Sequence, residues 1–230
     1  MALRKEEITR KLLHLFALLM PAGIFYLPES FRVHPAVPVA ILAFLLVGSI
    51  TVESLRFRVP AVQKTFRFCF GHLMRQEEDR KVTGSTYIIA AALLCSIIFY
   101  NYRYISFIVL TIFILGDAIA AIVGLSVGRI KIGKKSLEGS LACFAMCMAL
   151  FYFVFPHLPG AVFNAFNDRA WYSDIAAWSI SVAASLSTTI FELVPLRITK
   201  KLTINDNLAV PVITGGVIYL VEWYIFRVYG

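Results

Sequence analysis

Charged residues are scarce in this 230-residue chain, where Asp, Glu, Lys and Arg together make up 16%, against about 25% in a typical soluble domain. Hydrophobic residues make up 59%, which excludes a soluble enzyme and a disordered tail. Cysteine is also scarce, and the four cysteines form no Cys-x-x-Cys pair, which excludes a disulfide-stapled secreted domain. The composition therefore indicates an integral membrane protein.

The intervals without charge are long enough to cross a hydrocarbon layer of about 30 Å, which takes roughly 20 residues of helix. The interval 139–167 carries no charge, and the interval 104–128 carries one acid, Asp117. We therefore predict an all-α, polytopic membrane protein that forms a single domain over 1–230. Its seven predicted transmembrane helices lie near 11–28, 35–54, 83–101, 104–127, 137–156, 174–195 and 207–227.

The basic residues orient these helices. With seven spans, eighteen of the 22 Lys and Arg residues fall on the side that holds the N-terminus and the loops after helices two, four and six. The positive-inside rule then predicts a cytoplasmic N-terminus in the cell (inner or plasma) membrane. The net charge of +8 is a topology signal, so nucleic acid is not an expected partner. The cytoplasmic segment 55–82 has apolar residues at helical spacing between cations, which predicts an amphipathic helix at the headgroups.

An acid inside a span is costly and points to function. Asp117 lies eleven residues before Gly128, about 16 Å deep at 1.5 Å per residue. A protonated Asp bonded to a neighbouring helix is the structural alternative. A charged substrate could reach Asp117 only through a polar cavity open to the cytoplasm or through a helix break at Gly124 or Gly128.

The loop after this helix is basic, because Arg129, Lys131, Lys134 and Lys135 fall within seven residues. A triphosphate needs such neutralisation. Ser136 and the residues up to Gly139 open the next helix, whose free N–H groups can bind phosphate. The loop is no P-loop, since Lys135 stands where that motif needs Ser or Thr. A positive-inside loop with Ser136 as a helix cap is the alternative interpretation.

Three consecutive polar residues, Asn205, Asp206 and Asn207, open the seventh helix, which is more than a cap requires. Mg²⁺ prefers oxygen ligands, and we predict that Asp117 and Asp206 hold it.

Further polar clusters lie at the predicted cytoplasmic boundary, and interfacial anchoring or ion pairing is the alternative explanation for each. Three candidates for a general base, which the sequence does not rank, are His14, Glu53 and Glu192. Arg10 and Lys11 precede His14, and Arg56 follows Glu53 at i+3. All these clusters fall on one side, whereas the outer acids Glu29, Asp168, Asp174 and Glu222 are scattered. A carrier needs a pathway open to both sides, so the pattern favours an enzyme.

The motifs that carry these residues resemble the dolichol kinase, phytol kinase and CTP-dependent diacylglycerol kinase family. The resemblance covers roughly 5–215, and its specific part is the GD-A motif followed by K-S-x-E-G. In chain order the motifs are RKLLH, ESLR, GSTY, GDAIAAIVG, KKSLEGS and NDNLAVP. Two of them also look like segments of phosphatidate cytidylyltransferases, but the long K-R…K-D signature of those enzymes is missing here.

The resemblance implies that the γ-phosphoryl group of CTP passes to the hydroxyl of a lipid alcohol, such as a polyprenol, phytol, dolichol or diacylglycerol. By motif, Arg10, Lys11, Asp117 and Gly124 match positions tied to CTP use and catalysis. The nucleotide-side motif matches Lys134, Lys135, Ser136 and Gly139. Two alternatives stay open: a CTP:lipid-phosphate nucleotidyltransferase, and a transporter with Asp117 as its ion site. The oligomeric state is left open.

Overall fold

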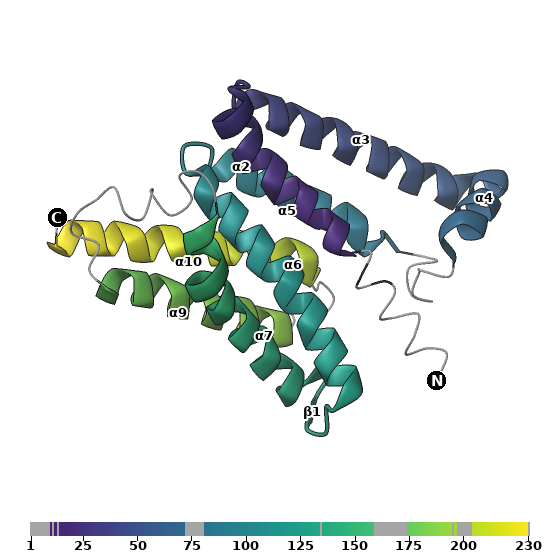
Figure 1. Cartoon of the computed structure of the whole chain (residues 1–230). Coiled ribbons are helices and arrows are strands. Elements are labelled where there is room, and N and C mark those ends of the chain that lie inside the picture. The colour runs from purple at the N-terminus through teal and green to yellow at the C-terminus, as the bar shows by residue number, and fades with distance from the viewer. Residues whose placement is uncertain are drawn as a thin grey trace.

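The computed structural model describes residues 10, 12, 14–71, 81–133, 135–158, 174–194, 196 and 204–229. It is a bundle of helices (Figure 1). The helical elements are η1 (Leu15–Leu18), α2 (Leu19–Phe31), α3 (Ala36–Arg58), α4 (Pro60–Phe70), α5 (Gly84–Ile98), α6 (Arg103–Ser126), α7 (Leu137–Ala149), η4 (Leu150–Val154), η5 (Phe155–His157), α9 (Asp174–Leu193) and α10 (Asp206–Tyr229).

The prediction of a helical membrane protein is confirmed, and a helical segment lies at each of the seven predicted intervals. Within the described ranges, four segments are long and apolar enough to cross a membrane: 36–58, 103–126, 137–157 and 206–225. The apolar helices 15–31 and 84–98 are shorter. The number of seven spans therefore stays a prediction.

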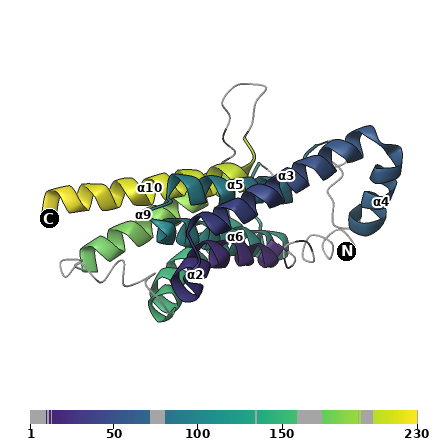
Figure 2. The ribbon, with the colours of Figure 1, turned by 90° about the horizontal axis from the view of Figure 1, so that it is seen from above.

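Helix α6 forms the centre of the bundle. Its residues from Ile105 to Ile114 are all buried, and it packs against α2 on one side and α7 on the other (Figure 1). Helices α9 and α10 lie side by side, as both views show (Figures 1 and 2). The one acid of α6, Asp117, is buried among the helices that pack around it.

A proline separates α3 from α4. Val59 is extended, with φ −116° and ψ 110°, as expected for a residue that precedes proline. Pro60 then opens α4 at a position where its missing N–H costs nothing. The helix predicted within 55–82 is thus present at 60–70, beyond the end of α3 (Figure 2).

A short β-hairpin, which the sequence analysis did not predict, joins α6 to α7. Strand β1 (Lys131–Ile132) pairs antiparallel with β2 (Lys135–Ser136), and Gly133 turns between them with φ +62°, a conformation that favours glycine. The side chain of Glu138 accepts hydrogen bonds from the backbone N–H groups of Arg129 (2.8 Å) and Ile130 (3.0 Å). The basic loop is therefore a β-hairpin that Glu138 connects to the first turn of α7.

Candidate functional site

Lys135 connects three elements at one end of the bundle. Its Nζ lies 2.7 Å from Oε1 of Glu192 at the end of α9 and 3.0 Å from Oδ2 of Asp206 at the start of α10. It also donates to the backbone carbonyl of Glu192. Burial lowers the pKa of the Lys135 ammonium, but the two carboxylates outweigh burial and raise its pKa above the ordinary value. The ammonium is therefore charged at physiological pH.

Glu192 forms the buried floor of this site. Its side chain is only 4% exposed, and its Oε2 has no hydrogen-bond partner among the residues that the structure describes. Burying an unpaired carboxylate oxygen costs free energy. Lys135 pairs with Oε1 of Glu192 and leaves Oε2 unpaired. The sequence predicts Glu192 as one of three general-base candidates but does not predict its central place.

Asp117 lies near this floor. It is 7% exposed, and it is close enough to Glu192 for their charges to interact. Of the two predicted routes to Asp117, a break of the helix at Gly124 is not observed, since α6 runs unbroken through Gly124 and ends at Ser126, two residues before Gly128. The exposed part of the site is its rim, where the side chains of Lys135 and Asp206 are 30% and 36% exposed. A charged ligand would therefore contact the rim first.

The polar run before α10 has three separate uses. The side chain of Asn205 accepts a hydrogen bond from the backbone N–H of Asn207 at 3.0 Å, as a helix cap does. Asp206 pairs with Lys135. The side-chain amide of Asn207 donates to the carbonyl of Gly84 at 3.0 Å and so connects α10 to the start of α5.

Gly124 of the GDAIAAIVG motif and Gly139 of the nucleotide-side motif lie at a close contact between α6 and α7. A Cβ on Gly139 would lie 2.5 Å from the carbonyl oxygen of Ala120, and one on Gly124 would lie 2.9 Å from Oγ of Ser136. Ser136 is buried and caps α7 by accepting from the backbone N–H of Gly139 at 3.2 Å. These contacts give Gly124, Ser136 and Gly139 a packing role that is independent of any nucleotide.

We expect Gly139→Ala to lower the free energy of unfolding by about 1–3 kcal/mol, the usual cost of overpacking. The added methyl group would meet a backbone carbonyl, which cannot move aside as a flexible side chain can. Thermal unfolding in detergent measures the change. Gly216→Ala is the matched control, because a Cβ there meets no atom within 4 Å. Equal unfolding temperatures for the two variants would contradict the packing role.

Glu53 belongs to a different cluster, between α3 and α5. Its Oε2 accepts from Nε of Arg56 at 2.6 Å, and its Oε1 accepts from the backbone N–H (2.9 Å) and hydroxyl (2.7 Å) of Thr83. Arg56 in turn donates to the carbonyl of Lys81. Both carboxylate oxygens of Glu53 are hydrogen-bonded, and the residue is only 4% exposed. This arrangement is more consistent with a structural contact between α3 and α5 than with the predicted role as a general base.

The other predicted residues lie on the hairpin, near η1, or outside the described residues. Lys131 donates from its Nζ to the carbonyl of Gly124 at 3.3 Å. His14 lines a cavity of about 270 Å³ between η1, α3 and α5. Arg10 is half-buried just before η1. Lys11 and Lys134 lie outside the described residues, so the structure does not place them.

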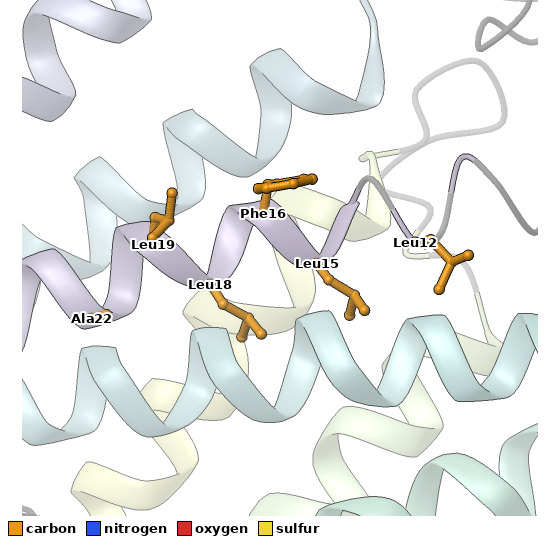
Figure 3. A pocket seen from close by; sticks show the side chains of 6 residues that line it. All are labelled: Leu12, Leu15, Phe16, Leu18, Leu19 and Ala22. Atoms are coloured by element: carbon orange, nitrogen blue, oxygen red, sulfur yellow. The ribbon is translucent and has the colours of Figure 1, made fainter.

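A second cavity, of about 430 Å³, is lined by apolar residues. Along η1 and α2, Leu15 and Leu18 point to one side of the helix while Phe16 and Leu19 point to the other (Figure 3). Leu12 and Ala22 complete its lining. Such a surface suits hydrocarbon chains.

Comparison with known proteins adds one relative. No family model matches the chain, and no solved structure does. The chain is similar to the uncharacterized protein RP860 of Rickettsia prowazekii (strain Madrid E), with 25% identity over 210 residues. The similarity covers 89% of each chain, so it extends over most of the bundle. The name of this relative assigns it no activity.

The donor set of the site suits Mg²⁺ chemically. Mg²⁺ typically takes one or two carboxylates and completes its shell with water and phosphate. Within the described part of the chain, no group of three or more His, Cys, Asp or Glu side chains forms a metal site. Two carboxylates, Glu192 and Asp206, nevertheless converge on one cationic group, and the buried Oε2 of Glu192 has no hydrogen-bond partner among the described residues.

Proposed function

We propose that this chain is a membrane kinase that transfers the γ-phosphoryl group of CTP to the hydroxyl of a lipid alcohol at the cytoplasmic leaflet. The observation that carries the proposal is the convergence of Lys135, Glu192 and Asp206 where α7 and α10 begin and α9 ends. Phosphoryl transfer needs charge neutralisation and positioning more than covalent help. A cation beside carboxylates, at the end of an apolar bundle, supports that chemistry.

The roles follow from depth and exposure. Asp206 and Glu192 would hold Mg²⁺, with Asp117 close by, and Mg²⁺ would neutralise charge on the β- and γ-phosphate oxygens. Lys135 and Lys131, on the hairpin, would contact phosphate. The preference for CTP rests on the family resemblance. The apolar surface beside η1 and α2 (Figure 3) would hold the tail of the alcohol, and His14, near one end of that helix, would accept the proton of its hydroxyl.

The test is transfer of label from γ-labelled CTP to lipid. Membranes that contain the protein, a pool of lipid alcohols and Mg²⁺ should produce a labelled lipid phosphate, and membranes without the protein should not. No labelled lipid with any alcohol of the pool would count against the proposal.

A transporter is the second candidate, because polar groups continue beyond the site. In the interior, hydroxyls of Ser187 and Thr214 lie 3.0 Å apart between α9 and α10. Near the predicted outer end, the buried carboxylate of Glu222 accepts a hydrogen bond from the hydroxyl of Tyr104. Glu222 is thus part of an interhelical contact, whereas the sequence suggested only scattered outer acids. A transporter would work without CTP, which separates the two candidates.

A further inference from the structure

The ammonium of Lys135 stands where a metal ion would be expected. Two carboxylate oxygens from different helices, on Glu192 and Asp206, lie 2.7 and 3.0 Å from its nitrogen. The backbone carbonyl of Glu192 also accepts from it. This carbonyl belongs to the last turn of α9, where the helix dipole favours a cation. Two carboxylates and the C-terminal end of α9, through the carbonyl of Glu192, therefore direct negative charge at one point.

The single positive charge of Lys135 does not neutralise both carboxylates. Oε2 of Glu192 is buried and has no hydrogen-bond partner in the described chain, although the residue is more than nine-tenths buried. A lysine is a compact charge on a flexible four-carbon stem, and the side chain of Lys135 is 30% exposed, so it has room to swing outward. A smaller, doubly charged ion could approach the same oxygens more closely.

We infer that Glu192 and Asp206 form a divalent-cation site in which Lys135 is the resident counter-ion that the metal displaces. Mg²⁺ binds oxygen at about 2.0–2.1 Å, so each carboxylate would move inward by roughly 0.6–1.0 Å from its distance to the ammonium. Oε2 of Glu192 would then gain a partner. The released ammonium would be free to contact phosphate, a last step that rests on the proposed function.

The exchange can be measured without nucleotide or lipid. Mn²⁺ is the probe, and electron paramagnetic resonance of the purified protein in detergent measures its binding. Glu192→Gln keeps the shape of the side chain and removes its charge. Since outer partners of a metal alone change affinity by about 10–100-fold, loss of this direct ligand should weaken binding by at least about 100-fold. Lys135→Met should strengthen binding about tenfold, because the competing ammonium is gone.

Glu222→Gln is the matched control, since Glu222 is also a buried carboxylate but lies near the other end of α10. It should bind Mn²⁺ as the wild type does. Absence of Mn²⁺ binding in the wild type would overturn the inference, and so would unchanged affinity in Glu192→Gln or weakened affinity in Lys135→Met. The inference and the kinase proposal fail separately. Binding in the predicted pattern without γ-phosphoryl transfer keeps the cation site, whereas transfer by a protein with the wrong Mn²⁺ pattern keeps only the kinase.

Discussion

Asp117→Asn should reduce γ-phosphoryl transfer from CTP by at least about 100-fold, the effect of losing one preorganised electrostatic group. Asp117 is buried in α6, close enough to Glu192 for their charges to interact, so its negative charge would help to hold the proposed Mg²⁺. Asn has nearly the same shape, and the packing of α6 should persist. The measurement is the initial rate of label transfer to lipid by the purified variant.

Glu29→Gln is the control for this variant. Glu29 pairs with Arg103 at 2.9 Å, at the start of α6 rather than near its end, and its replacement should leave transfer unchanged. A folded Asp117→Asn protein that transfers label at the wild-type rate would remove Asp117 from the mechanism. If the wild-type protein shows no CTP-dependent transfer of label to lipid, that result would instead favour the transporter.

Arg56→Met should lower the free energy of unfolding by about 3–5 kcal/mol, because it leaves a buried carboxylate without its counter-charge. Arg56 and Glu53 are both buried and lie 2.6 Å apart, and the guanidinium also rests over the rings of Phe57 and Phe66, with its central carbon 4.3 and 5.0 Å from their centroids. Unfolding in detergent, followed by circular dichroism, measures the loss.

Arg58→Met provides the comparison, since Arg58 is a cation two residues away that is exposed. An exposed charge away from such a cluster changes stability by about 0.5 kcal/mol or less. Similar losses of unfolding free energy for the two variants would show that the Glu53 cluster does not stabilise the contact between α3 and α5.

The positions of charged residues predicted the helices well. The expected helix at 104–127 is observed as Arg103–Ser126, and the one at 174–195 as Asp174–Leu193, because charge ends an apolar segment in a bilayer. The hairpin at 131–136 could not be predicted in this way. Its strands have two residues each, too few to show any periodicity.

The site was predicted in its parts and not in its connections. Lys135 was assigned to phosphate and Asp206 to metal, yet the two form an ion pair across 71 positions of sequence. Glu192 lies 57 positions from Lys135 in the sequence. Only the packing of the helices brings it to Lys135, so the sequence did not separate it from the other acids. Gly139 shows a different difficulty: a glycine that admits a phosphate and a glycine that admits a neighbouring helix both lack a side chain, so sequence alone does not separate them.

The most direct test of the central claim is the origin of the phosphorus that enters lipid. Purified protein is incubated with Mg²⁺, lipid alcohols, phosphatidate and CTP labelled at either the α or the γ position. We predict labelled lipid phosphate from γ-labelled CTP and none from α-labelled CTP. Label from the α position would make the protein a nucleotidyltransferase and contradict the kinase, and no transfer from either position, with ATP as well as CTP, would shift the assignment to transport.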